Sequence, residues 1–168
     1  VMRKLLVLLV FAGFHQKASA VNYYVSTTGN DKADGLTVAT AWQTLQRVQQ
    51  AASDTLIKAG DSILFKRGDV FTGTLQWATI WGQNCPTGTR NHPITLAAYG
   101  TGAKPEFHYP KDSDKKPENR ILMLFSGVEH IVIDGLHFSE ADKTNDKVTP
   151  ANCGAAIYLG TMDEAVTS

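Results

Sequence analysis

Cysteine is scarce in this sequence, whose only two, Cys85 and Cys153, stand in separate loops rich in Gly, Pro and Asn. Neither has the Cys/His spacing of a zinc site, so no metal ligands are assigned. An exported chain is able to join them in a disulfide. The sequence does not determine whether the two loops come together, so a disulfide between Cys85 and Cys153 and two free thiols both stay open.

A surplus of positive charge is also missing. The 168 residues hold 16 basic and 16 acidic side chains, and three of the basic ones, Arg3, Lys4 and Lys17, lie within residues 1–20. Residues 21–168 therefore carry 13 basic (16 − 3) against 16 acidic side chains, a net charge of −3. That balance excludes a domain that holds nucleic acid by bulk charge.

Long apolar runs are limited to one, residues 5–14, which is too short for a bilayer that needs about 20 residues. Arg3 and Lys4 precede it, and Ala18-Ser19-Ala20 follows it. This order is typical of a secretory signal peptide with cleavage after Ala20. We therefore expect a signal peptide over residues 1–20 and one domain over 21–168. The mature protein should be a secreted monomer (extracellular, periplasmic or at the cell surface) with no membrane span.

One segment has helical periodicity. Trp42, Leu45, Val48 and Ala52 recur at helical spacing, and Thr40 is placed to cap them, so we expect a helix within residues 41–53. The other apolar segments are short and bounded by Gly, Pro, Asn or Asp, which is typical of strands. The expected strands are 23–25, 62–66, 70–75, 93–99, 121–125, 130–134 and 155–159.

Many short strands fit either a sandwich or barrel, or a solenoid. The spacing favours the solenoid, because Ile131 and Ile157 are 26 positions apart (157 − 131), close to one turn of a wide β-helix. Gly135 permits a tight corner between two strands, with apolar residues pointing inward on both sides. We therefore expect residues 131–134 to stack in parallel on a strand of an adjacent coil.

The order of several segments resembles the opening of exported right-handed parallel β-helix proteins of the pectin-lyase-like superfamily. The nearest functional analogy is polysaccharide lyase family 9. The resemblance spans most of residues 22–138. It is carried by residues 23–31 with Asp34-Gly35, by Ala41-Trp42-Gln43-Thr44-Leu45, by 58–69, and by 93–100 with Lys104-Pro105.

This resemblance implies a mainly β fold, the N-terminal part of a parallel β-helix whose open end is covered by the helix from Trp42 to Ala52. It implies an exported protein that acts on a polysaccharide, and a pectate-lyase-like activity is the leading hypothesis. The alternatives are a glycoside hydrolase and a non-catalytic surface or adhesion protein on the same fold. It also implies calcium in a full-length lyase. Such sites are assembled across several coils and this sequence supplies about two, so we expect the catalytic residues beyond residue 168 and assign no catalytic or substrate-binding residue.

Asn30, Asp31 and Asp34 offer clustered oxygens of the kind that bind calcium. Their spacing is not that of an EF-hand loop. We favour a pair of Asx-turns beside Gly29 and Gly35. A second short motif, Lys66-Arg67-Gly68-Asp69, contains an adhesion-type tripeptide, but a turn between strands with Gly68 as its pivot explains it better.

His108, His130 and His137 are candidate general bases. Asp134 and His137, which lie close together in the sequence, come nearest to a catalytic pair. The favoured interpretation is structural, with Asp134 in a polar turn and His137 at the rim of the sheet.

Aromatic side chains offer a possible platform for sugar rings, since they suit the apolar faces of pyranoses. Packing in the core or the N-terminal cap is the favoured explanation. The candidates are Trp77, Trp81, Tyr99 and Tyr109.

Overall fold

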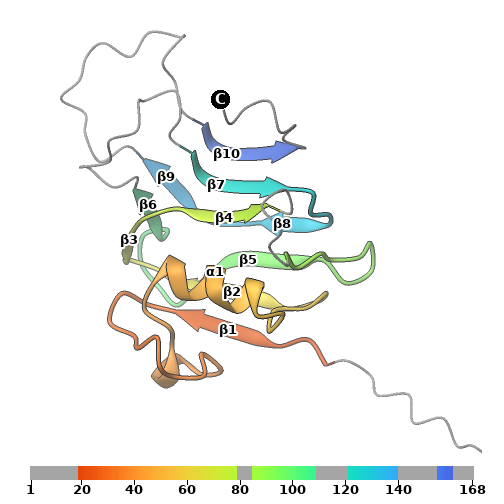
Figure 1. The fold of residues 1–168 in the computed structure, drawn as a ribbon. Helices are drawn as coiled ribbons and strands as arrows, with labels where there is room; N and C mark the ends of the chain where they lie inside the picture. Colours follow the sequence, from red (N-terminus) through yellow and green to blue (C-terminus); the bar gives the residue numbers. More distant parts are fainter. Residues whose placement is uncertain (1–18, 79–84, 109–120, 140–154, 161–168) are drawn as a thin grey trace, which may run out of the picture.

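Short strands lying side by side in parallel dominate the chain (Figure 1). The computed structural model describes residues 19–78, 85–108, 121–139 and 155–160. The strands are β1 (Asn22–Val25), β2 (Ser62–Lys66), β3 (Val70–Thr72), β4 (Leu75–Ala78), β5 (Ile94–Tyr99), β6 (Glu106–His108), β7 (Ile121–Ser126), β8 (Ile131–Ile133), β9 (His137–Ser139) and β10 (Ala155–Gly160). The helices are the 3₁₀-helix η1 (Val38–Thr40) and the α-helix α1 (Leu45–Ser53).

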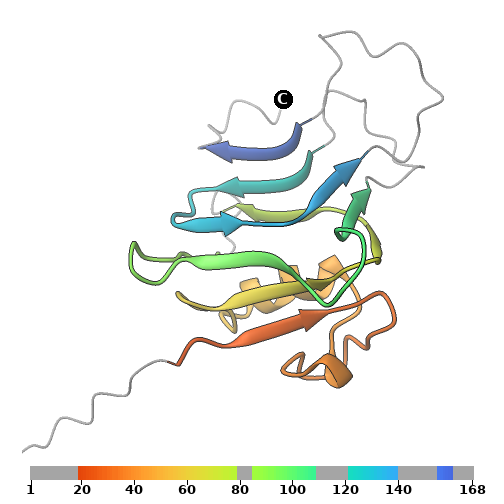
Figure 2. The ribbon, with the colours of Figure 1, turned by 180° about the vertical axis from the view of Figure 1, so that it is seen from behind.

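The strands form three sheets, with orders β1-β2-β5-β8, β3-β6-β9 and β4-β7-β10. From β2 onward the chain makes three passes, and each pass lays one strand in each sheet. Every pairing between these strands is parallel. Figure 2 shows the first sheet stacked from β1 to β8. The expected parallel stacking of residues 131–134 is confirmed for Ile131–Ile133, which pairs with residues 94–96 of β5, and the described residues supply three passes rather than about two.

The spacing between Ile131 and Ile157 does not measure a turn of a solenoid. Ile131 lies in β8 of the first sheet, whereas Ile157 lies in β10 of another sheet and pairs with Met123. The expectation failed because strands of different sheets carry similar apolar patterns when they border one core. The corner at Gly135 is confirmed, because this residue has a φ of 68° and connects β8 to β9.

Alternation along the strands builds the core. On β2 and β5 the side chains of Ile63, Phe65, Ile94 and Leu96 are fully buried, while their neighbours are only partly covered. In the sheet of β3, β6 and β9, each strand places one phenylalanine inward at the same register. Phe107 stacks on Phe71 and on Phe138, with ring centroids 5.4 and 5.5 Å apart.

The helix begins later than its periodicity indicated. Thr44 is its N-cap and accepts a hydrogen bond from the Arg47 N–H, whereas Thr40 ends η1 and does not cap α1. Trp42 precedes the helix, forms a parallel bridge with Val25 and stacks on Tyr23. Trp42 is therefore buried because it packs against β1, and not because it lies on the buried face of a helix.

The helix covers a sheet edge. α1 packs against β4, the outermost strand of the third sheet, and the Gln49 side-chain oxygen accepts a hydrogen bond from the Gln76 backbone N–H at 3.2 Å. An uncovered edge strand exposes a row of unpaired backbone groups. The helix thus covers the edge of β4.

Within the described part of the chain, no helix has the length and apolar character needed to cross a bilayer. Most of the expected signal peptide, residues 1–18, lies outside that part, and Ser19 and Ala20 are exposed.

Candidate functional site

Polar side chains gather on the outer face of β6 and β9. Phe107 and Phe138 point inward, so the residues on either side of them point outward. The parallel register pairs Glu106 with His137 and His108 with Ser139. This arrangement brings together four side chains, the Glu106 cluster, which comprises Glu106, His108, His137 and Ser139.

Glu106 is the centre of the cluster. The Ser139 hydroxyl donates a hydrogen bond to Glu106 Oε1 at 2.6 Å. His108 Nε2 lies 2.8 Å from the same oxygen, close enough for an ion pair, although the ring nitrogen is not aligned for a hydrogen bond. His137 Nδ1 is 4.0 Å away, at the limit of an ion pair.

The environment favours the charged form of the carboxylate. The Ser139 hydroxyl, followed by the His108 ring, holds the pKa of Glu106 below its ordinary value. The side chain of His108 is 24% exposed and that of His137 is 58% exposed, so solvent reaches the cluster. A solvent-accessible carboxylate between two imidazoles accepts hydrogen bonds from hydroxyl groups, as the Ser139 contact shows.

The cluster has a limited chemical repertoire. It contains a single carboxylate, so it does not supply the carboxylate pair with which most glycoside hydrolases work. No group of three His, Cys, Asp or Glu side chains among the described residues is arranged to hold a metal ion. Hydroxyl recognition and proton exchange are what the geometry permits.

Sequence reasoning identified His108 and His137 but missed the carboxylate between them. The available signal was the pair of triplets Glu106-Phe107-His108 and His137-Phe138-Ser139, each with an aromatic residue between polar ones. Asp134, the candidate partner of His137, is exposed, and its backbone N–H donates a hydrogen bond to the Leu96 carbonyl, as the favoured interpretation of a polar turn implies. His130 lies elsewhere, in the turn before β8, 3.9 Å from Glu129.

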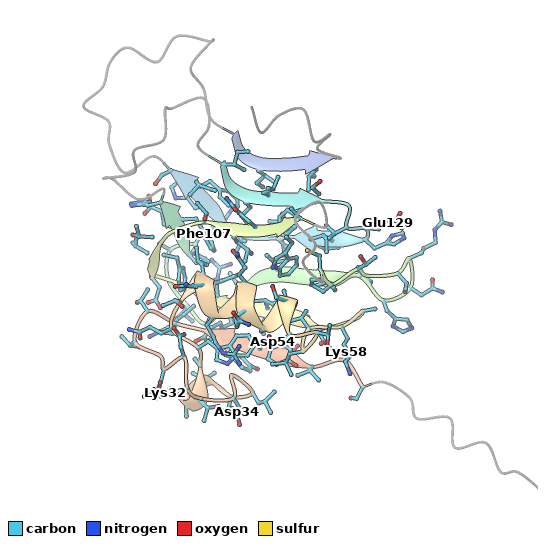
Figure 3. The ribbon with its side chains drawn as sticks, in the orientation of Figure 1. Lys32, Asp34, Asp54, Lys58, Phe107 and Glu129 are labelled. Atoms are coloured by element: carbon cyan, nitrogen blue, oxygen red, sulfur yellow. The ribbon has the colours of Figure 1, made fainter. Side chains whose placement is uncertain are left out.

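The loop oxygens near the N-terminus are structural. Asn30 accepts a hydrogen bond from the Lys32 N–H and Asp34 from the Leu36 N–H, which confirms the two Asx-turns. Figure 3 shows Lys32 and Asp34 projecting from a loop away from the sheets. Asp31 instead accepts from the backbone N–H groups of Gln43 and Thr44 and from the Thr44 hydroxyl. It thereby fixes the segment that leads into α1.

Residues 67–69 connect β2 to β3, so the motif that begins at Lys66, the last residue of β2, forms the expected turn. Gly68 has a φ of 84°, a conformation that favours glycine. The Asp69 carboxylate accepts from the Ser26 hydroxyl and the Thr27 N–H, at 2.9 and 2.8 Å. Asp69 thus ties this turn to the loop after β1.

Of the four aromatic candidates for a sugar platform, the structure describes Trp77 and Tyr99, and Trp77 fits the favoured explanation of core packing. Trp77 is 1% exposed and packs edge-to-face on Phe125, so it belongs to the core. Tyr99 lies half-buried on the outer face of β5, edge-to-face with Tyr24. Trp81 and Tyr109 lie outside the described residues, as does Cys153. Burial raises the pKa of the Cys85 thiol, which favours its neutral form.

The chain was compared with protein-family models, with curated protein sequences and with solved structures. No family model and no curated protein sequence matches the chain. A solved structure of the native GH136 lacto-N-biosidase from Eubacterium ramulus is similar, with a TM-score of 0.59, 24% identity, and coverage of 81% of this chain and 23% of that one. Its selenomethionine form gives a TM-score of 0.58, 25% identity, and coverage of 82% and 24%.

A rhamnogalacturonan lyase is also similar, with a TM-score of 0.50, 19% identity, and coverage of 71% of this chain and 28% of that one. The likeness is one of fold. This chain spans about a quarter of the length of the proteins it matches.

Proposed function

We propose that this chain is the N-terminal part of an exported, right-handed parallel β-helix protein that cleaves glycosidic bonds in a polysaccharide. The observation that carries the proposal is the repeated three-strand pass, with all pairings parallel. Crossovers between parallel strands are right-handed in nearly all proteins. Both of the neighbours named above are carbohydrate enzymes.

The Glu106 cluster contributes to glycan binding in this proposal. Its carboxylate already accepts one hydroxyl hydrogen bond, and sugar hydroxyls are donors of the same kind. The cluster contains one carboxylate, so the catalytic groups come from later passes of the full-length protein. His108 and Glu106 then act as substrate-binding residues, and their loss should raise KM more than it lowers kcat.

The reaction class has two candidates. The resemblance of the sequence to polysaccharide lyase family 9 favours elimination. The higher TM-score of the lacto-N-biosidase is the observation that favours hydrolysis.

The full-length natural protein decides between these candidates. It is incubated with pectate, rhamnogalacturonan, alginate and oligosaccharides with lacto-N-biose ends, each with calcium and with a chelator. Unsaturated products identify a lyase, and new reducing ends without unsaturation identify a hydrolase. The absence of both, together with retained binding to one glycan, would replace the enzyme proposal with the non-catalytic surface protein.

A further inference from the structure

A buried carboxylate faces the point where the expected signal peptide ends. Asp61 lies in the turn before β2 and is 4% exposed. Its Oδ1 accepts a hydrogen bond from the Val21 backbone N–H at 2.8 Å, and its Oδ2 accepts one from the Lys58 backbone N–H at 2.8 Å. Both of its oxygens are therefore bound to backbone groups.

Asp61 has no cationic partner among the residues that the structure describes: no nitrogen of Lys, Arg or His lies within ion-pair distance of it. Lys58 directs only its backbone toward the carboxylate and carries its side chain on the surface (Figure 3). His92 packs beside Gly60 and is exposed, and the Tyr23 hydroxyl donates to the Leu56 carbonyl. A carboxylate withdrawn from water without a counter-charge is costly.

The Val21 nitrogen is held in place independently of Asp61. The Val21 carbonyl accepts a hydrogen bond from the Ser62 N–H, and the next residue, Asn22, pairs with Ser62 in the β1–β2 ladder. Ser19 and Ala20 are exposed just before it. A charge created on this nitrogen would thus meet Asp61 without ordering any further group.

We propose that cleavage between Ala20 and Val21 completes this site, because the new α-ammonium group of Val21 becomes the counter-ion of Asp61. The inference rests on the export that forms part of the proposed function. A signal peptidase hydrolyses the peptide bond with one water. Ala20 leaves with the carboxylate, and the Val21 amine gains protons and a positive charge. A neutral amide hydrogen bond to a buried carboxylate is replaced by an ion pair at the same position, so removal of the signal stabilises the fold.

The pH dependence has a defined sign. An α-amino group titrates at about 7.7–8.0 in an unfolded chain, and the neighbouring carboxylate raises its pKa in the folded protein. The added stability is therefore fully present below that unfolded value and is lost as the pH rises through the folded pKa. Burial, and then the charge of Asp61, raises the pKa of Tyr23 above its ordinary 10.0, which places it above the window.

The test uses the full-length protein in two forms, one starting at Val21 and one retaining Ala20 as its first residue. Each is released from a removable N-terminal fusion. The longer form keeps every mature side chain and the amide hydrogen bond but moves the charge one residue away. At pH 7 we expect the unfolding equilibrium constant of the Val21 form to be about tenfold lower, because an opposite charge at this distance shifts a pKa by about 1–3 units and one unit corresponds to a tenfold change in the equilibrium constant. The difference should vanish well above pH 8 and in the Asp61→Asn pair.

Three outcomes overturn the inference: equal stability of the two forms at pH 7, a difference independent of pH, or an exported protein whose sequenced N-terminus is not Val21. If Asp61→Asn fails to fold, the pH series on the two wild-type forms still decides. Glycan turnover is measured on the same samples, so a failure of the proposed enzymatic function is seen separately from a failure of the Val21–Asp61 ion pair.

Discussion

Ser139 donates its hydroxyl hydrogen bond to Glu106 across two paired strands, over 2.6 Å. The two residues are 33 positions apart in the chain and are brought together only by the register of β6 and β9. That register converts four separate polar residues into one cluster on the outer face of a sheet.

The cluster predicts a pH-dependent contribution of Glu106 to stability. The folded pKa is held below the ordinary value of 4.5, so the contribution is present above that value and is lost as the pH falls through the folded pKa. The Ser139 hydroxyl makes the largest contribution to the lowered pKa of Glu106, and the His137 ring makes the smallest. Ser139→Ala should therefore raise that pKa most, and His137→Ala should raise it least. Carboxyl titration by NMR measures both. An unchanged Glu106 pKa in Ser139→Ala would contradict this account.

Removal of the central ring of the phenylalanine ladder should be costly. Phe107 is 1% exposed and contacts Phe65, Phe71 and Phe138. Phe107→Ala should lower the free energy of unfolding by about 3–5 kcal/mol, because the rings around it cannot close the cavity. Val70→Ala is the matched control on the same sheet; Val70 is 44% exposed, and its loss should change that energy by about 0.5 kcal/mol or less. Urea unfolding of both variants measures the contrast.

Gln49 should protect the edge of β4. Gln49→Ala leaves the Gln76 N–H without its acceptor, which should cost about 1 kcal/mol and increase self-association through the uncovered strand. Gln46→Ala, at an exposed position of the same helix, makes the same change in side chain and helix propensity without touching β4. Thermal unfolding and light scattering distinguish the two variants. Equal behaviour would remove the role assigned to Gln49.

Asp31 is predicted to be a structural residue and not a calcium ligand. Asp31→Ala removes the acceptor for two backbone N–H groups and one hydroxyl before α1, at a cost of about 1–3 kcal/mol. The loss in melting temperature should be the same with calcium and with a chelator. A wild-type protein that calcium stabilises, with a variant that calcium does not, would restore the metal interpretation.

Local patterns predicted most of the strands and turns, because apolar residues between Gly and Asp report burial directly. They merged residues 70–75 into one strand, where the structure has β3 and β4 in different sheets, and they missed β6. They misplaced Trp42, whose spacing suits a helix although it lies in an extended segment against Val25. They also misread Ile131 and Ile157 as successive turns, since strands of different sheets share one core. Glu106 was missed for a related reason. Its partners are set by register, and residues 33 positions apart, as Glu106 and Ser139 are, have a register that local patterns do not determine.

The last prediction concerns activity. Residues 21–168 on their own should not depolymerise a polysaccharide, whereas the full-length protein should. A site on this fold draws groups from successive passes and needs them fixed within about 0.5 Å. The Glu106 cluster provides one carboxylate and two imidazoles, and the chain covers about a quarter of the enzymes it resembles. Unsaturated products and reducing ends are followed for both proteins on one set of glycans. Turnover by residues 21–168 that is abolished in Glu106→Gln or His108→Ala would place the catalytic centre on β6 and β9.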